Sequence, residues 1–308
     1  MLKTWVQTSI PLSNAVSYAT PNQYGIVDIS PATIKWMQYA LTRFVRFSGD
    51  MGLTAVNVGH VSSWLEYEAG RGVSPYTVNS YLRAAKTLFS RLQRNGIATD
   101  NPAQPIKPWP EPRPSPKAIT KSDYHSLLTA VSNSRDRAIF STFWATGCRL
   151  GGLLSMDINN IERWLENGRL QFALLVKEKG KNGKPKPRWC YSKGEEALAL
   201  DSWLNERPTC RTASLFTTFT KTPRPMKQTA VSSMFRKARI AADIDGNDHH
   251  CNPHAFRHAF AIRQLEQTKD LPLVSAWLGH HSPEFTAKIY VIRHEYKLRA
   301  AYFSVEEA

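Results

Sequence analysis

Two side chains near residue 255 have the types and spacing that phosphate chemistry requires. His254 and Arg257 stand three residues apart, so on a helix they share one face. A guanidinium binds phosphate oxygens through a rigid fork of donors, and an imidazole can donate or accept a proton near neutral pH. The pair therefore predicts a site that binds a phosphate and moves a proton.

Three further candidates are weaker when each is taken alone. Arg149 follows a Thr-Gly-Cys turn, and a single arginine in this setting is typical of a surface charge. Lys179 lies in a basic predicted hairpin, which is typical of a solvated loop, although a lysine there can reach a phosphate as a proton donor. Tyr290 follows His280 and His281, and by itself it is typical of a buried residue that closes a helix.

A metal site is the competing interpretation of the histidine-rich region. The candidate ligands are His249, His250, Cys251, His254 and His258. The glutamate of the His-Glu-x-x-His pattern is absent, and no second ligand pair has zinc-finger spacing. We therefore predict neither a metal nor another cofactor.

A proline-rich stretch at 101–117 divides the chain. Proline removes backbone donors and fixes φ, so we expect an extended, semi-rigid linker there. This divides the chain into an N-terminal extension at 1–25, a helical DNA-binding domain at 26–100, and a catalytic domain with a C-terminal tail at 118–308.

Helical patterns fill the segment before the linker. Ser-Pro pairs at 30–31 and 74–75 are typical of helix starts, and Val61, Trp64 and Leu65 indicate a short helix between them. The third helix has an apolar stripe from Val78 to Leu92. Its opposite face carries Asn79, Arg83, Lys86 and Arg94.

The segment after the linker mixes helices with one small sheet. Thr120-x-x-Asp123 resembles a capping box, and a helix at about 135–146 should end at Gly147. Two strands, at 169–176 and 187–191, flank a Lys-rich turn at 177–186. Further helices are predicted at 193–207, at 229–242, and from Pro253 onward with a break near Gly279.

The composition favours a polyanion as partner. Lysine plus arginine is 40 and aspartate plus glutamate is 25, so the net charge is +15. A basic protein without such a partner is the alternative. No apolar run approaches the roughly 20 residues of a membrane span, no signal peptide is evident, and four scattered cysteines fit reduced thiols. We expect a cytoplasmic protein.

In this order and spacing, the chemical candidates resemble the tyrosine recombinase, or lambda-integrase, family. The family signature runs Arg, Lys, His-x-x-Arg, His or Trp, and Tyr. It is matched here by Arg149, Lys179, His254, Arg257, His280 and Tyr290. Three short motifs around these residues also match the family: Thr-Gly-Cys-Arg, Pro-His-Ala-Phe-Arg-His and Leu-Gly-His. The resemblance covers about residues 28–295.

The resemblance implies a mainly α fold with a small sheet. It implies a helical core-binding domain and a catalytic domain that close on double-stranded DNA as a C-shaped clamp. Four protomers would assemble on two sites, two on each, without membrane association, and the protein would associate with the nucleoid when bound to DNA.

The resemblance also implies the roles of the signature residues. Tyr290 would attack a DNA phosphate, leaving a 3′-phosphotyrosyl enzyme and a free 5′-hydroxyl. Arg149 and Arg257 would bind the phosphate oxygens, His254 would take the tyrosine proton, and Lys179 would protonate the departing 5′-oxygen. The covalent link conserves the bond energy, so neither ATP nor a metal is required.

Three departures from the family pattern stand out. The family usually has an acidic residue three positions after the first arginine; here it is Gly152, so that support must come from elsewhere. The tyrosine usually lies nine positions after the second histidine. Here Tyr290 lies ten positions after His280, which we expect to contact the phosphate, and nine positions after His281. In the hairpin, Lys181 or Lys184 is the alternative proton donor.

We therefore predict a site-specific DNA recombinase of the integrase, transposase or resolvase type. The alternatives are a type IB topoisomerase or telomere resolvase, and a non-enzymatic DNA-binding protein on a decayed recombinase fold. The candidate DNA-reading residues are Arg83, Lys86, Lys227, Gln228 and Arg236.

Overall fold

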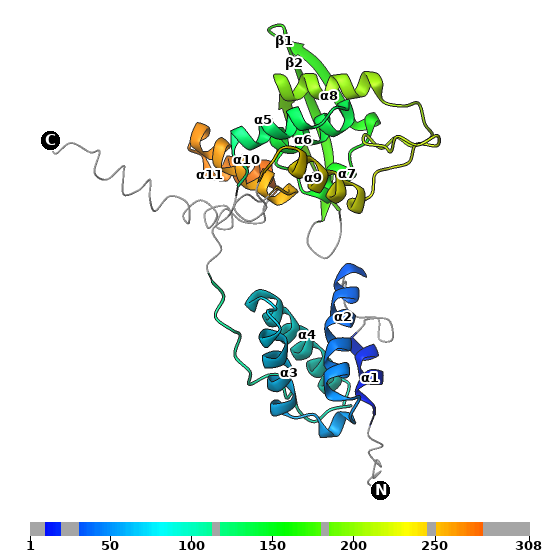
Figure 1. Ribbon diagram of the computed structural model, residues 1–308, viewed down its shortest axis with the longest axis vertical. Helices are drawn as coiled ribbons and strands as arrows, with labels where there is room; N and C mark the ends of the chain where they lie inside the picture. The colour runs from blue at the N-terminus through cyan, green and yellow to red at the C-terminus, as the bar shows by residue number, and fades with distance from the viewer. Residues whose placement is uncertain (1–9, 20–30, 113–117, 180–184, 245–250, 280–308) are drawn as a thin grey trace, which may run out of the picture. The chain divides into compact units, whose positions relative to one another are not determined.

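The computed structural model describes residues 10–19, 31–112, 118–179, 185–244 and 251–279. The chain forms two compact units, Met1–Arg113 and Pro114–Ala308. Each unit has its own hydrophobic core. Figure 1 shows the first unit in blue and teal and the second from green to orange.

The regular elements in the described part of the first unit are all helices, with one isolated β-bridge between Pro11 and Gly52. Its elements are α1 (Leu12–Ala15), η1 (Val16–Ala19), α2 (Pro31–Ser48), η3 (Leu53–Ala55), α3 (Val58–Gly70) and α4 (Pro75–Arg94). The predicted start of α4 is confirmed, because the Ser74 side chain accepts a hydrogen bond from the Thr77 amide. Leu12 and Ala15 are fully buried in this core, so part of the expected N-terminal extension belongs to the unit.

The polar face of α4 is only partly exposed to solvent. Asn79 is buried, and its amide nitrogen donates to the Trp109 carbonyl while its oxygen accepts from the Trp109 amide (2.9 and 2.8 Å). The Lys86 ammonium donates to the Ile106 carbonyl at 2.8 Å, and Ala103 is fully buried. The first part of the proline-rich segment is therefore packed onto the first unit, since α4 supplies partners for its backbone.

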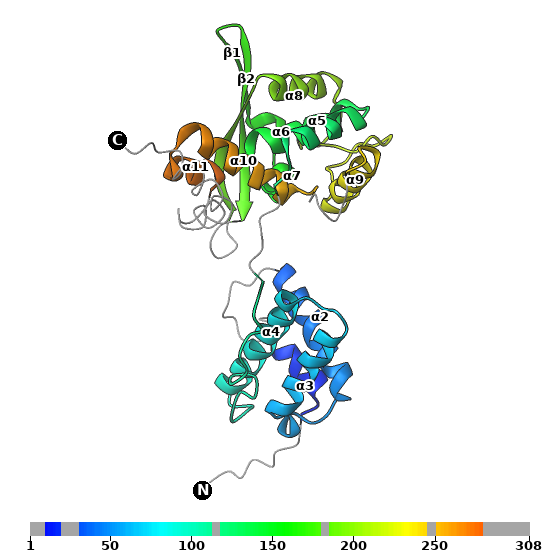
Figure 2. The same cartoon turned by 60° about the vertical axis from the view of Figure 1, so that its left-hand side comes forward.

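The second unit packs its helices against a three-stranded antiparallel sheet in the order β1-β2-β3. The strands are β1 (Ile161–Glu166), β2 (Arg169–Lys179) and β3 (Pro185–Lys193). The helices are α5 (Lys121–Ala130), α6 (Ser134–Thr146), α7 (Leu150–Leu154), η4 (Ile158–Asn160), α8 (Glu195–Glu206), α9 (Gln228–Ala241), α10 (Pro253–Thr268) and α11 (Leu271–Leu278). Helix α6 packs against β3, α8 and α10 (Figures 1 and 2).

Aromatic side chains fix α10 against its neighbours. The ring of Phe256 lies 5.8 and 6.2 Å from those of Phe140 and Phe143 on α6, and 5.6 Å from that of Phe235 on α9. Phe256 is fully buried, so the rotation of α10 about its axis is set by this contact. The next residue along the helix is Arg257.

Most predicted elements of this unit are confirmed, with two differences in the sheet. Thr120 and Asp123 form the expected capping box, and α6 ends at Gly147 with φ +57°. Strand β1 was not predicted, and the Lys-rich turn is shorter than expected, since Lys177 pairs with Pro187 and Lys179 with Pro185. Pairing with a neighbour decides strand length, and composition does not report it. Residues 182–183 lie outside the described residues.

The cysteines of the chain are buried or half-buried. All four cysteines are free thiols. Burial raises the pKa of Cys148 to about 11 and that of Cys190 to about 12, so both stay protonated at neutral pH. Among the described residues, no helix is long and apolar enough to cross a membrane.

Candidate active site

A tight turn between α6 and α7 brings Arg149 to the sheet. Gly147 adopts a left-handed φ, and a Cβ there would lie 2.7 Å from the ring of Phe260, so only glycine fits. Arg149 is the N-terminal cap residue of α7. Its backbone amide donates to Oε1 of Glu178 at 2.8 Å, and its Nη1 donates to Oε2 of the same carboxylate.

Arg257 joins three segments that are far apart in the chain. It is 6% exposed; its Nη1 donates to the Gly147 carbonyl at 2.8 Å and its Nη2 donates to the Leu278 carbonyl. Burial and the neighbouring Arg149 lower the pKa of Arg257 to about 10. It therefore stays charged at neutral pH and is oriented through backbone carbonyls rather than by a single partner.

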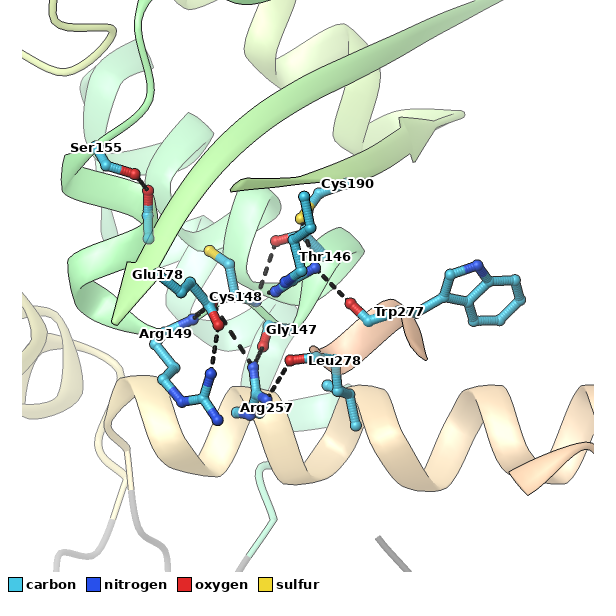
Figure 3. Close-up of polar contacts among 12 residues, drawn as sticks. Thr146, Gly147, Cys148, Arg149, Ser155, Glu178, Cys190, Arg257, Trp277 and Leu278 are labelled. Carbon is cyan, nitrogen blue, oxygen red and sulfur yellow. Dashed lines mark hydrogen bonds and ion pairs between the residues drawn. The ribbon is translucent and has the colours of Figure 1, made fainter. Parts of the chain in front are cut away.

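Glu178 on β2 lies between these arginines (Figure 3) and was not among the predicted site residues. Its carboxylate is 5% exposed and also accepts from Arg188 Nη2 at 3.1 Å, while Arg257 Nη1 lies 3.9 Å away. Burial opposes its ionisation, but Arg188, the Arg149 amide and Arg257 outweigh that effect and hold the pKa of Glu178 below its usual value. Glu178 is thus an anion among three cations.

His254 lies in the first turn of α10, where Asn252 caps the helix by accepting from the Ala255 amide. The side chain is exposed. Loss of hydration, then the charges of Arg257 and Arg149, lowers the pKa of His254 below its usual value. At neutral pH this imidazole is uncharged and can accept a proton. The structure therefore brings Arg149, His254 and Arg257 into one electrostatic neighbourhood.

The remaining sequence candidates fall partly outside the described residues. Lys179 is the last residue of β2, directly after Glu178, and only its backbone is described. His280, His281, Tyr290, Lys181 and Lys184 lie outside the described residues, just past α11 or in the β2–β3 connection. Of the candidate DNA readers, Arg83, Lys227, Gln228 and Arg236 are exposed, whereas Lys86 is half-buried.

The metal alternative gains no support from the described residues. Within them, no three His, Cys, Asp or Glu side chains are grouped so that they could hold a metal ion. His249 and His250 of the alternative cluster lie outside that part of the chain.

Sequence reasoning missed Glu178 and Arg188. Glu178 is a lone acidic residue in the basic run Val176–Lys181, and the acidic residue expected near Arg149 is missing at Gly152. Together, these two irregularities could have indicated Glu178. A cluster of buried cations needs a nearby anion, so a carboxylate missing at residue 152 must be supplied by another residue.

Comparisons with known proteins identify the family. The phage integrase family matches residues 117–296, which is more than half of the chain. A tyrosine recombinase XerC from Alcanivorax borkumensis is 30% identical over 263 residues, covering 82% of this chain and 80% of the relative. XerC of Salmonella typhi is 27% identical over 270 residues, covering 85% of each chain.

Solved structures share the fold. The site-specific recombinase XerH, bound to palindromic difH substrate in a post-cleavage complex, matches with a TM-score of 0.70 and 22% identity, over 90% of this chain and 80% of that one. A lambda integrase dimer bound to a core site matches with a TM-score of 0.73 and 17% identity, over 93% and 79%. The chain therefore belongs to the phage integrase family and is a tyrosine recombinase, an enzyme that breaks and rejoins DNA.

Proposed function

We propose that this recombinase exchanges strands at a specific DNA site through a 3′-phosphotyrosyl intermediate. The observation that carries the proposal is the convergence of two oriented guanidiniums, Arg149 and Arg257, with an uncharged imidazole, His254. A phosphodiester gains negative charge on its non-bridging oxygens during substitution. Donors fixed beforehand stabilise that charge without reorganising.

The chemical steps use the chain's own residues. The Tyr290 hydroxyl forms a bond to phosphorus as the bond from phosphorus to the 5′-oxygen breaks, and His254 takes the phenol proton. Lys179 gives a proton to the departing 5′-oxygen, while Arg149 and Arg257 bind the non-bridging oxygens. Attack by the 5′-hydroxyl of another strand reverses these steps and completes the exchange.

The protein should also assemble on DNA. We infer that the first unit is the core-binding domain and that both units close on DNA as a C-shaped clamp, with a homotetramer on two sites. Support comes from a solved relative described as a lambda integrase tetramer bound to a Holliday junction. The tail at 291–308, which lies outside the described residues, would dock on a neighbouring protomer, and the enzyme would associate with the nucleoid.

Four exposed polar residues are the proposed contacts with the target DNA: Arg83 on α4, and Lys227, Gln228 and Arg236 at α9. Lys86 is a weaker candidate than its neighbour Arg83, because its ammonium already donates to the Ile106 carbonyl. Substituting a phosphate contact should weaken binding to every sequence, whereas substituting a base contact should relax specificity.

A nicked suicide substrate tests the proposal. Loss of the short fragment that carries the 5′-hydroxyl prevents religation, so the active enzyme should remain covalently attached to DNA, and Tyr290→Phe should not. Trapped Tyr290→Phe would contradict the assigned nucleophile and point to Tyr296. Sequencing the trapped DNA identifies the target site.

Matched variants separate the neighbouring candidates. His280→Ala should slow trapping far more than His281→Ala, and Lys179→Ala more than Lys181→Ala or Lys184→Ala. If His281→Ala slows trapping more than His280→Ala, His281 is the phosphate contact. If Lys181→Ala or Lys184→Ala slows trapping more than Lys179→Ala, that lysine is the proton donor. Relaxation of supercoiled plasmid without recombinant products would favour topoisomerase chemistry.

A further inference from the structure

A single carboxylate coordinates the arginines of the site. Oε1 of Glu178 accepts from the Arg149 amide at 2.8 Å and from Arg188 Nη2 at 3.1 Å, and Arg257 Nη1 lies 3.9 Å away. Its Oε2 accepts from Arg149 Nη1. Three guanidiniums share this one anion, so two positive charges remain unbalanced beside it. The carboxylate thus limits the repulsion among the arginines while leaving charge for a phosphate.

Gly152 provides the space that this carboxylate occupies. A Cβ on residue 152 would lie 2.9 Å from Oε1 of Glu178 and 3.0 Å from its Cγ. Gly152 sits inside α7 with no positive φ, so its backbone does not itself require glycine. The missing side chain at 152 and the carboxylate from β2 are therefore complementary. Glu178 thus supplies the carboxylate that the family usually places three positions after the first arginine.

Arg188 extends the same cluster to the end of α11. Its Nη1 donates to the Trp277 carbonyl and to Cys190 Sγ. A Cβ on Gly279 would lie 2.9 Å from Cδ of Arg188, and Gly279 has a φ of +64°. Arg257 donates to the next carbonyl, that of Leu278. Two arginines that contact Glu178 thus bind the last turn of α11.

We propose that Glu178 is the positioning residue of this active site, with Gly152 as its steric partner. Glu178 orients Arg149 toward the scissile phosphate through two hydrogen bonds, and its charge balances Arg257, which the Gly147 and Leu278 carbonyls hold in place. Through Arg188 it fixes the end of α11, directly before His280. The proposal rests on the phosphate-binding roles assigned above to Arg149 and Arg257, and Glu178 itself contacts no substrate atom.

The central test is Glu178→Gln, which keeps the side-chain shape and removes the charge. Cleavage of the suicide substrate in a single turnover should slow by about 100-fold, the cost of displacing groups that bind a reacting centre by about 1 Å. The DNA dissociation constant should change by less than about threefold. Glu162→Gln, an exposed residue on β1, makes the same change in net charge and should cleave at the wild-type rate.

A neutral substrate distinguishes positioning from a general loss of structure. A methylphosphonate at the scissile position has no anionic charge for the arginines to bind. The Glu178→Gln defect should therefore shrink to about threefold or less on this substrate. An equal defect on both substrates would overturn the proposal, and so would wild-type cleavage by Glu178→Gln.

Variants at residue 152 test the steric partnership and do not depend on the stability of Glu178→Gln. Gly152→Ala keeps every charge and should slow cleavage by about 10-fold, because the carboxylate must move. The double variant Gly152→Glu with Glu178→Gly should cleave at least 10-fold faster than either single variant. Wild-type cleavage by Gly152→Ala contradicts the partnership. A wild-type enzyme that is never trapped on DNA contradicts the proposed function instead.

Discussion

The two units each bury a glutamate against arginine, but the two clusters are built differently. In the first unit, Glu68 on α3 is 2% exposed and accepts from Nε and Nη2 of Arg43 on α2, at 3.0 and 2.6 Å. Nη1 of Arg43 donates to the Tyr39 hydroxyl at 3.2 Å. The hydrogen bond to Glu68 is the main cause that raises the pKa of Arg43. Every nitrogen of this guanidinium has a partner, so Arg43 joins two helices and has no nitrogen left without one.

In the second unit the buried carboxylate has three arginine neighbours, whereas Glu68 has Arg43 and, at 3.9 Å, the exposed Arg71. Glu178 forms ion pairs with Arg149, Arg188 and Arg257. In the part of the chain that the structure describes, Nε and Nη2 of Arg149 have no acceptor. Excess cations with unused donors can bind an anion from outside, whereas the Arg43 guanidinium has a partner for every nitrogen. Unused guanidinium donors therefore separate a binding site from a structural ion cluster.

The largest effect should come from Arg257→Lys. A lysine keeps the charge but lacks the fork that reaches both the Gly147 and Leu278 carbonyls, so cleavage should slow by about 10²- to 10³-fold. Arg43→Lys, the matched change in the first unit, should leave the single-turnover cleavage rate of the bound complex within about twofold. Equal losses in both variants would contradict the distinction between the two clusters.

Glu68→Gln should act on stability instead of catalysis. It leaves Arg43 without its counter-charge in a mostly buried position, which costs about 3 kcal/mol of unfolding free energy. Chemical denaturation followed by circular dichroism measures this loss. Once the variant is saturated with DNA, its cleavage rate should match that of the wild type. A catalytic defect larger than the one caused by Glu178→Gln would reverse our assignment of the two glutamates.

The pH dependence of cleavage should reveal His254. Its lowered pKa keeps the imidazole uncharged at neutral pH, so it accepts the tyrosine proton there and loses that ability only as the pH falls below about 6.5. The single-turnover rate should therefore fall on the acid side of that value. His254→Gln should cleave about 10²-fold more slowly at pH 7, and its rate should no longer fall at low pH. If the rate of this variant still falls as in the wild type, another residue is the base.

The smallest effects should come from helix caps, which occur in both units. Asn57 accepts from the His60 amide at the start of α3, and Thr120 accepts from the Asp123 amide at the start of α5. Asn57→Ala and Thr120→Ala should each cost about 1 kcal/mol of unfolding free energy. Calorimetry should detect both losses, with cleavage unchanged within about twofold. A rate defect in only one variant would connect that cap to the active site.

The helix starts and part of the candidate site could be predicted because their signals are local. The Ser-Pro pair before α4, the capping box of α5 and the glycine that ends α6 each act within a few residues. Arg257 shares its helix with His254, so their common neighbourhood follows from helical spacing alone. The burial of Asn79 was not predictable, since its partner Trp109 lies 30 residues along the chain.

The sequence by itself determined the order of most elements, the family resemblance, and the choice of Arg149, His254 and Arg257 as candidates. Only the tertiary structure decided which anion balances the arginines. Glu178 is 29 residues from Arg149, and the register of β2 directs its side chain inward while its neighbour Lys177 is exposed. The space it fills exists because Gly152 has no side chain. Complementarity of charge and volume between distant segments arises only when they pack, so no local pattern in the sequence reports it.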